Sequence, residues 1–269
     1  MKTKIFATAT LTLLASAQCV LAQVIFSDNF DSYADQTAFS AAWNVGLTGG
    51  GLTLSTEQAF SPSQSVQQDL TAKASGHDIT PVSGSDAQPL SWSFQFYDST
   101  QAGNLRQFAT IRDNAPSLAQ LVAFGAYNDT TLTLNRYTGL SVTAADLDTY
   151  YAVRVAFAPG PNWFILNGPG APTRSTGWHE LEAVFGDTTV DFFVDGVNAL
   201  SGLTTSYASA AGAITFDRLT VGSGLSSANG VAFYDDVMVQ VIPEPSSFAL
   251  CLLGGFGLAA GIISRRRKA

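Results

Sequence analysis

Cysteine is missing from the central part of the chain, because Cys19 and Cys251, the two cysteines present, lie near its ends. A scaffold held together by disulfides is therefore excluded between them. Residues 23–241 are long enough to form one large all-β domain with a sizeable core. We expect this domain to be stabilised by its core or by a bound metal ion.

Basic residues are scarce in the same region. Of the 13 Lys and Arg residues, six lie within residues 1–22 or 242–269, whereas only Glu244 of the 21 acidic residues does. Residues 23–241 therefore carry seven basic and 20 acidic side chains, a net charge of −13. Such a surface repels phosphate backbones, which argues against nucleic-acid binding. The acids are nearly all Asp, a residue of turns and of calcium sites.

Helical periodicity and internal repeats are also absent, and short alternating segments take their place. Residues 90–96 and 151–157 alternate between apolar and polar, with Arg154 on the polar side, which predicts half-buried strands. Two more such segments follow and are joined or closed by tight turns at Gly186-Asp187 and Asp195-Gly196. These two segments are residues 177–185 and 188–194, and the other expected strands are residues 106–111, 120–127, 131–137, 213–221 and 231–241. The pattern predicts an all-β fold, an antiparallel two-sheet sandwich.

Long apolar runs occur at both ends of the chain. Residues 1–22 combine Lys2 and Lys4 with an apolar core and a small-residue cleavage site before Gln23. This pattern predicts a secretory signal peptide and export by the Sec machinery. Residues 246–264 carry no charge and are long enough for one transmembrane helix. The basic residues after this run should stay in the cytoplasm.

The tail, residues 242–269, has three parts in a fixed order: a Pro-Glu-Pro motif, the apolar run and an arginine cluster. The motif and the cluster comprise Pro243, Glu244, Pro245, Arg265, Arg266 and Arg267. A membrane anchor does not require the prolines, which hold the segment extended. The tail resembles the PEP-CTERM sorting signal of Gram-negative bacteria that make exopolysaccharide. A plain C-terminal membrane anchor is the alternative interpretation.

This resemblance implies a route for the protein. It predicts anchoring in the inner membrane during transit and processing by an exosortase near the Pro-Glu-Pro motif. It also predicts delivery to the cell surface or to the extracellular matrix. The partners that it implies are the exosortase, the Sec machinery and the membrane itself.

Three separated blocks of the central region carry a second resemblance. They are the Phe-x-Asp-x-Phe-Asp opening at residues 26–31, the segment 177–179 with residues 190–196, and the closing residues 233–239. Together they resemble concanavalin A-like lectin/glucanase domains, often of laminin-G type. The resemblance implies that residues 23–241 form a jelly-roll sandwich. It does not carry function, because this fold hosts lectins, glycosidases and structural modules.

A calcium site is the metal centre that the resemblance implies. Members of this family often bind a structural Ca²⁺ where the first and last strands meet, which points here to Asp28, Asp31, Asp235 and Asp236. Carboxylate and carbonyl oxygens suit a hard cation. Neighbouring Asp235 and Asp236 point to opposite faces of a regular strand, so at most one is a ligand. Alternatively, these acids solvate strand ends and blunt sheet edges.

Glycoside hydrolysis lacks its expected motif in this chain. The reaction needs two carboxyl groups at a set separation, and hydrolases of this fold carry them as Glu-x-Asp-x-x-Glu or Glu-x-Asp-x-Glu. Glu180 with Glu182, and Asp146 with Asp148, share a face but complete neither pattern. No Gly-x-Ser-x-Gly elbow marks a nucleophilic serine.

These observations predict an exported, non-catalytic protein that interacts with carbohydrate or exopolysaccharide. Aromatic rings stack on sugar faces, but the tyrosines are too scattered along the sequence to define a sugar site. Trp178, like Trp92, Phe94, Phe96 and Phe192, is expected in the core. The ligand-binding residues therefore stay open. Two alternatives remain, a divergent glycoside hydrolase of the same fold and a purely structural matrix module.

Overall fold

The computed structural model describes residues 22–100, 103–114, 121–129, 139–156, 163–204, 215–226 and 230–242. All of them belong to one compact unit, Ala22–Ile242. The expected signal peptide and sorting tail lie outside the described residues, except for Ala22 and Ile242, as does the strand expected at residues 131–137. No helix in the described part is long and apolar enough to cross a membrane.

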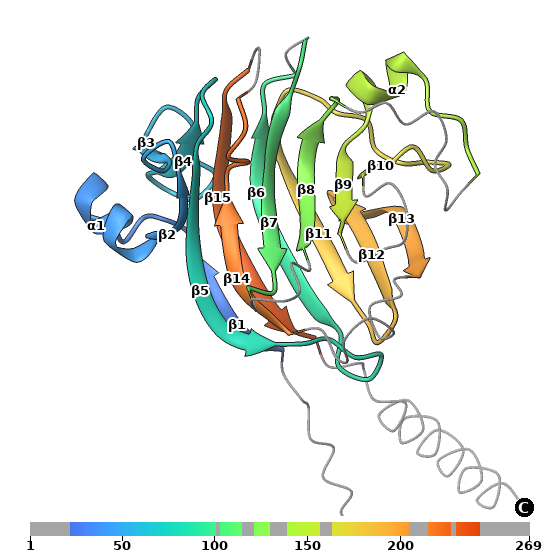
Figure 1. The fold of residues 1–269 in the computed structure, drawn as a ribbon, viewed down its shortest axis with the longest axis horizontal. Helices are drawn as coiled ribbons and strands as arrows, with labels where there is room; N and C mark the ends of the chain where they lie inside the picture. Colours follow the sequence, from blue (N-terminus) through green and yellow to red (C-terminus); the bar gives the residue numbers. More distant parts are fainter. Residues whose placement is uncertain are drawn as a thin grey trace, which may run out of the picture. The chain divides into compact units, whose positions relative to one another are not determined.

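The described strands form two antiparallel sheets (Figure 1). The eight-stranded sheet contains β1 (Gln23–Asp28), β3 (Thr53–Ser55), β4 (Ser65–Gln68), β6 (Leu90–Asp98), β11 (Gly177–Phe185), β12 (Thr189–Val194), β13 (Val197–Thr204) and β15 (Ala232–Val241). Its order in space is β13-β12-β11-β6-β15-β4-β3, and β1 also pairs with β15.

The second sheet has seven strands, β2 (Val45–Thr48), β5 (Ala74–Val82), β7 (Arg106–Arg112), β8 (Leu121–Tyr127), β9 (Ala152–Val155), β10 (Trp163–Ile165) and β14 (Phe216–Val221). Its order is β10-β9-β8-β7-β14-β5-β2. Non-consecutive neighbours in both sheets fit a jelly-roll sandwich, so the expected fold class is confirmed.

The core between the sheets follows from the period of two in the strands. In β6, Trp92, Phe94 and Phe96 are each at most 1% exposed. Across the core, the Phe124 ring meets Phe94 edge-on, with centroids 6.5 Å apart, and Phe192 with centroids 5.6 Å apart. Such edge-to-face pairs add about 0.5–1.5 kcal/mol each beyond the burial of their area. The apolar face predicted for residues 90–96 is confirmed, but the strand is not half-buried there, because Ser91 and Ser93 on the opposite face are buried as well.

Two short helices, α1 (Gln36–Ala42) and α2 (Ala144–Thr149), correct the expectation of a domain without helices. The Asp35 side chain caps α1, and Thr143 and Asp146 form a capping box on α2. These caps stabilise helices of only seven and six residues. Segments this short carry too few apolar positions for a helical period to stand out in the sequence.

The turn between β12 and β13 follows the sequence prediction. Asp195 and Gly196 have φ angles of +52° and +72°. Positive φ at both central residues defines a type I′ turn, whose twist matches that of the flanking strands. The turn fixes where the Asp195 side chain points, which matters for the contacts described below.

Gly125 allows β7 and β8 to approach closely. It lies opposite Phe108 in the ladder and has a φ of +159°. A Cβ atom at this position would lie 2.3 Å from the Gln107 carbonyl oxygen and 2.6 Å from the Phe108 Cα atom. The backbone would have to move to accept any side chain here.

We expect Gly125→Ala to lower the free energy of unfolding by about 1–3 kcal/mol more than Gly139→Ala does, because overpacking forces backbone shifts. Gly139 is the matched control, since its φ is +69° but a Cβ atom added there would meet no atom within 4 Å. Chemical denaturation measures both losses. Equal losses for the two variants would contradict the close approach of β7 and β8.

Candidate functional site

The first and last strands meet where β15 changes its pairing partner. β4 pairs with residues 232–234 of β15, and β1 pairs with residues 237–241 of the same strand. Asp235 and Asp236 lie between these two segments, at a register shift against β6, and Asp236 has a φ of +43°. A bulge of this kind redirects side chains at a strand junction. It allows the predicted aspartates from both ends of the domain to meet one loop, residues 60–64.

Asp31 and Asp235 hold this loop by accepting hydrogen bonds from it. Asp31 Oδ1 accepts the backbone N–H groups of Ser63 at 3.1 Å and Gln64 at 3.0 Å, and the Ser63 hydroxyl at 2.6 Å. Asp235 Oδ2 accepts the N–H groups of Phe60 and Ser61 at 2.9 and 3.1 Å. The hydrogen bond from the Ser63 hydroxyl holds the pKa of Asp31 below its usual range.

Asp235 is buried, and its carboxylate accepts four hydrogen bonds. Besides the two loop N–H groups, it accepts the Ser61 hydroxyl at 3.0 Å and the Asp236 N–H at 2.8 Å on Oδ1. Burial nevertheless raises its pKa to about 6. Burial also raises the pKa of Asp236, and the nearby charge of Asp31 adds to that rise.

Asp28 is bonded to the aromatic residues that follow β1. Its Oδ2 atom accepts the Tyr33 hydroxyl at 2.5 Å and the Trp43 indole N–H at 2.8 Å, and Oδ1 accepts the Phe30 N–H at 2.8 Å. Trp43 and Phe30 are fully buried. Asp28 therefore orients an aromatic cluster at this end of the sandwich.

Asp28 and Asp236 line a cavity of about 640 Å³ together with Tyr33 and His77, which we call the junction cavity. The carboxylate oxygens of Asp28, Asp31 and Asp235, which belong to the predicted calcium ligand set, accept N–H and O–H donors in this structure. The described residues contain no group of three or more His, Cys, Asp or Glu side chains that would hold a metal ion. Calcium binding itself stays a prediction.

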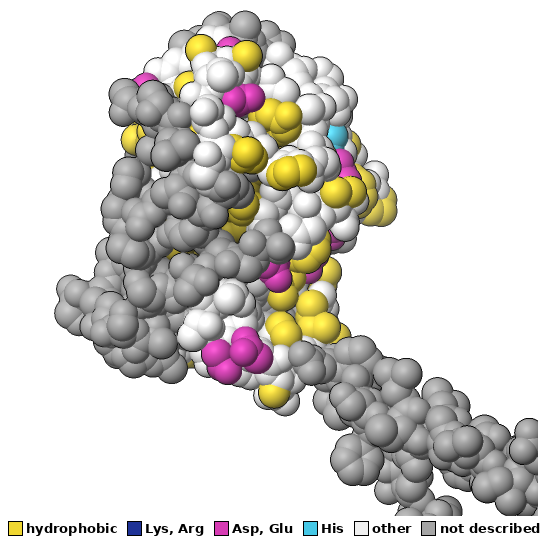
Figure 2. Space-filling model, turned by 90° about the vertical axis from the view of Figure 1, so that its right-hand side faces the viewer, with side chains coloured by type: hydrophobic (Ala, Val, Ile, Leu, Met, Phe, Trp, Pro, Cys, Tyr) yellow, Lys and Arg dark blue, Asp and Glu magenta, His cyan; other side chains and the backbone are white. Residues whose placement is uncertain are grey.

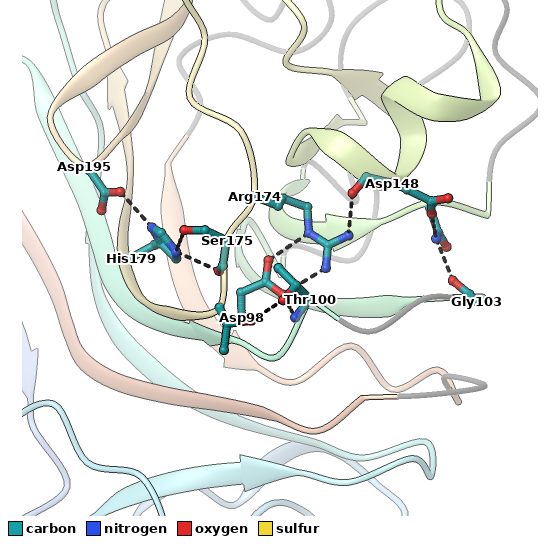
Figure 3. Close-up of polar contacts among 10 residues, drawn as sticks. Asp98, Thr100, Gly103, Asp148, Arg174, Ser175, His179 and Asp195 are labelled. Atoms are coloured by element: carbon teal, nitrogen blue, oxygen red, sulfur yellow. Dashed lines mark hydrogen bonds and ion pairs between the residues drawn. The ribbon is translucent and has the colours of Figure 1, made fainter.

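A second polar network surrounds His179 at the start of β11 (Figure 3). His179 Nδ1 lies 2.7 Å from Asp195 Oδ2, and Nε2 lies 3.0 Å from the Ser175 hydroxyl oxygen. This connectivity is that of a Ser-His-Asp triad. Nε2 also lies 2.9 Å from the Ser175 carbonyl oxygen. The sequence contained these three residues but no local motif that would group them.

The contact to the carbonyl oxygen favours a structural role for His179. A carbonyl oxygen only accepts hydrogen bonds, so a proton on Nε2 satisfies this contact and leaves Nε2 unable to take the Ser175 proton, as a general base must. The Asp195 side chain is 47% exposed. Neither the junction cavity nor the groove described below includes these residues. We interpret the network as a clip between the loop before β11 and the β12–β13 turn.

A buried ion pair fixes the same loop beside the clip. Arg174 donates to Asp98 with two nitrogens, at 2.8 and 2.9 Å, and the two side chains are 3% and 1% exposed. Arg174 also reaches the Asp148 carbonyl oxygen at 3.3 Å, while the Asn128 amide donates to Gly103 and to the Asp148 side chain (Figure 3). A bidentate buried pair gives geometric specificity. Asp148 therefore accepts hydrogen bonds in this network, whereas Asp146 belongs to the capping box of α2.

The outer face of the seven-stranded sheet carries a groove that the sequence analysis did not identify. A single row of paired residues crosses this face, namely Trp163, Arg154, Ala123, Thr110, Thr220 and Gly76. Small residues in the row leave space above the sheet. The resulting cavity, which we call the sheet groove, measures about 240 Å³ and is lined by Phe108, Thr110, Arg112, Leu121, Arg154, Thr220 and residues 46, 48, 74 and 222–225.

The sheet groove has a positive charge in an acidic domain. Its lining contains Arg112 and Arg154 and no acidic residue. By contrast, the edge of the sandwich in Figure 2 presents acidic and hydrophobic side chains, and no Lys or Arg is visible among its described residues. The sequence held a signal for this face, because Arg106, Phe108, Thr110 and Arg112 alternate in β7. Only the pairing of the strands adds Arg154 to the same face.

Aromatic residues gather beside the groove. The Tyr127 and Trp163 rings stack with centroids 3.8 Å apart and an interplanar angle of 4°, and Phe108 meets Trp163 edge-on at 5.2 Å. Tyr127 and Trp163 pack against a small satellite core of Val142, Ala152 and Ile165. Phe108 therefore lines the groove while its neighbours hold it in place.

Trp178 lies outside the core, although its strand alternation had suggested a core position. On the outer face of the eight-stranded sheet, it packs against Phe60 and Tyr97 with ring-centroid distances of 5.9 and 5.5 Å. Phe60 is 51% exposed. The reason is register: His179, not Trp178, pairs with the core residue Phe96.

Comparison with known proteins found matches among solved structures alone. No protein-family model matches the chain, and no curated protein sequence does. Similar solved structures include the cellulose-induced protein Cip1 (14% identity, TM-score 0.47, covering 80% of this chain and 96% of that one). An alginate lyase Aly36B mutant in complex with an alginate trisaccharide is 10% identical, with a TM-score of 0.47 and coverages of 82% and 99%. Domain 4 of AbnA, an arabinanase from Geobacillus stearothermophilus, in complex with arabinotriose, is 12% identical, with a TM-score of 0.45 and coverages of 83% and 96%.

The raised pKa of Asp235 predicts a pH dependence of stability. Its folded pKa of about 6 exceeds the unfolded value of 3.8, so the folded state binds more protons between these values and its stability falls as pH rises through them. Asp235→Asn removes this contribution. Relative to the unmodified chain, the free energy of unfolding of the variant should rise by about 1–2 kcal/mol between pH 4 and pH 7.

Denaturant titrations across this pH range measure the difference. Asp31→Asn is the matched control, because the lowered pKa of Asp31 confines its titration to more acidic pH. Its difference from the unmodified chain should stay constant between pH 4 and pH 7. A constant difference for Asp235→Asn as well would show that burial does not raise the pKa of Asp235.

Proposed function

We propose that residues 23–241 form a non-catalytic carbohydrate-binding domain and that a glycan lies in the sheet groove. One observation carries this proposal: the groove offers Thr110 and Thr220 hydroxyls and two guanidinium groups beside the Phe108 ring. Sugars present hydroxyls at their edges and apolar C–H groups on their faces, so a mixed lining of this kind suits them. At about 240 Å³ the groove takes a short stretch of a longer polymer.

The placement on a sheet supports a binding role. Thr110 and Thr220 pair across β7 and β14, and neighbouring ladders hold both strands. Side chains on rigid strands lose little entropy when a ligand binds, which lowers the cost of association. The groove lining contains no carboxylate, whereas glycoside hydrolysis by the usual route requires two.

A serine hydrolase is a catalytic alternative distinct from the divergent glycoside hydrolase, and the Ser175, His179 and Asp195 geometry would support it. A serine hydrolase would react covalently with a fluorophosphonate at Ser175, whereas the clip would not. We propose that the clip is structural, because Nε2 of His179 lies 2.9 Å from a carbonyl oxygen, which only accepts hydrogen bonds. Covalent labelling of Ser175, or release of reducing ends from a bound glycan, would overturn the non-catalytic role.

We further propose that the protein is exported by the Sec machinery and sorted through its PEP-CTERM-like tail. The supporting observations are the apolar runs at both ends, Pro243-Glu244-Pro245 and the terminal arginines. A polysaccharide-binding domain delivered to the surface or matrix of a Gram-negative bacterium would meet exopolysaccharide there. This proposal includes a structural calcium ion at the strand junction but does not depend on it.

Filling the sheet groove should abolish glycan binding. We expect Thr220→Trp to weaken binding by more than about tenfold, because the indole occupies the space that the sugar needs. Affinity electrophoresis against a panel of neutral and acidic polysaccharides, followed by calorimetry on the best ligand, measures the effect. Val197→Trp is the matched control, since Val197 is 46% exposed in the β12–β13 turn region, away from the groove lining.

Two results would contradict this assignment. Binding that survives Thr220→Trp but is lost in Trp178→Ala would place the glycan on the aromatic cluster of the eight-stranded sheet. Binding to no polysaccharide in the panel would favour the structural matrix module.

The sorting proposal predicts a processed C-terminus. In a Gram-negative host that encodes an exosortase, the surface-released protein should end near Pro243–Pro245, as measured by intact mass. Replacing Pro243, Glu244 and Pro245 by alanine should keep the tail on the chain and the protein in the membrane fraction. A released protein whose mass includes Arg265–Arg267 would refute processing near the motif.

A further inference from the structure

Four arginines of the described residues lie on the outer face of the seven-stranded sheet. Two of them are paired with carboxylates, and two are not. Arg106 is paired with Asp129, and Arg218 donates to both oxygens of Asp78, at 2.5 and 3.2 Å. Arg218 holds the pKa of Asp78 below its usual range. These two cations are neutralised by partners from the same chain.

Arg112 and Arg154 are different. Within the described ranges neither forms an ion pair with a carboxylate, which is what distinguishes them from Arg106 and Arg218. The Nε atom of each is also buried without a hydrogen-bond partner. A buried N–H group without an acceptor destabilises the folded state, and more so when it belongs to a charged group. The chain carries this cost at two positions in one groove.

The strand pairing places a second positive charge beside Arg112. Arg112 lies directly opposite Arg218 in the β7–β14 ladder. Like charges directly opposite each other destabilise a sheet. An ion pair with Asp78 neutralises the charge of Arg218, whereas no carboxylate of the described residues neutralises that of Arg112. An anion in the groove would satisfy it.

We propose that the sheet groove recognises a glycan whose sugars carry carboxylate groups, a polyuronate, and that Arg112 and Arg154 bind those carboxylates. This inference rests on the proposed carbohydrate-binding function and narrows its ligand class. The guanidinium fork matches a carboxylate with two parallel N–H bonds. Thr110 and Thr220 then bind the hydroxyls of the same sugars.

The separation of the two arginines suits two different groups on a polymer. Arg112 is on β7 and Arg154 is on β9, with β8 between them, and their partners on β8, Leu121 and Ala123, are two residues apart. Two strand spacings and a rise of two residues along the strand place the two Cα atoms roughly 12 Å apart. We expect each arginine to hold its own carboxylate, so a polymer with repeated acidic sugars should bind better than one acidic sugar.

The net negative charge of the domain does not prevent this contact. At physiological salt, charges are screened over about 8 Å, so the potential inside the groove is set by its own lining. That lining has two cations and no acid. Distant carboxylates slow the approach of a polyanion and leave the contact itself favourable.

The test compares one glycan with and without its charge. The full chain is titrated calorimetrically with an oligogalacturonate and with the same oligosaccharide after its carboxyl groups have been reduced to alcohols. We expect the acidic form to bind about tenfold more tightly or better, because hydrogen bonds to charged groups are the strong ones. Arg112→Gln and Arg154→Gln should each remove most of that preference, so that the acidic form loses far more affinity than the reduced form.

Arg218→Gln is the matched control. It removes the same charge from the same sheet face, but Arg218 is already paired with Asp78 and is not part of the groove lining. Its affinity for the acidic form should stay within about twofold of the unmodified chain. Circular dichroism and melting temperature check that each variant is folded.

The remaining outcomes separate this inference from the function beneath it. Equal binding of the acidic and reduced forms, blocked by Thr220→Trp, would overturn the polyuronate inference and keep the glycan site. Equal losses of affinity for the acidic form in Arg218→Gln and Arg154→Gln would overturn it too. Dextran sulfate that binds as tightly as the oligogalacturonate would have the same consequence, because charge alone would then explain the affinity. Binding of neither form, with no ligand in the polysaccharide panel, would overturn both proposals.

Discussion

The buried carboxylate of Asp235 is the contact on which the architecture depends most. It accepts four hydrogen bonds, from the backbone of residues 60, 61 and 236 and from the Ser61 hydroxyl. These bonds attach an early loop to the last strand at the point where β1 and β4 take different halves of β15 as partners. Because β15 also pairs with β6, the centre of the eight-stranded sheet is completed only when the last strand is in place.

This arrangement assigns separate roles to the charged groups of the domain. The aspartates near the ends of the chain act as acceptors that hold loops and aromatic rings. The Asp98–Arg174 pair and the His179 clip do the same for the loop before β11. Arg112 and Arg154 are the exception, since nothing in the described structure uses their charge. Groups that the fold itself does not satisfy are the natural candidates for ligand binding.

Sequence reasoning worked best where a local pattern has one physical cause. Alternation in residues 90–96 predicted which side of β6 faces the core, and Asp195-Gly196 predicted a tight turn, because both depend on backbone geometry within a few residues. It failed for Trp178, whose side is decided by pairing with β6, and for α1 and α2, whose caps act within too few residues to leave a period. The four aspartates were expected to meet, but only Asp31 and Asp235 hold the same loop, as hydrogen-bond acceptors. Asp28 accepts hydrogen bonds from aromatic residues and lines the junction cavity with Asp236.

The sequence by itself determined the all-β class, the acidic surface and the alternation that orients each strand. Its two ends also predict a route of export. These properties depend on composition and on neighbours within one strand. Only the tertiary structure decided which strands pair, and therefore which side chains share a face. Arg112 and Arg154 are 42 residues apart in the numbering of the chain, and no local pattern connects them. They line one groove because β8 lies between β7 and β9, and that order is set by packing across the whole sandwich.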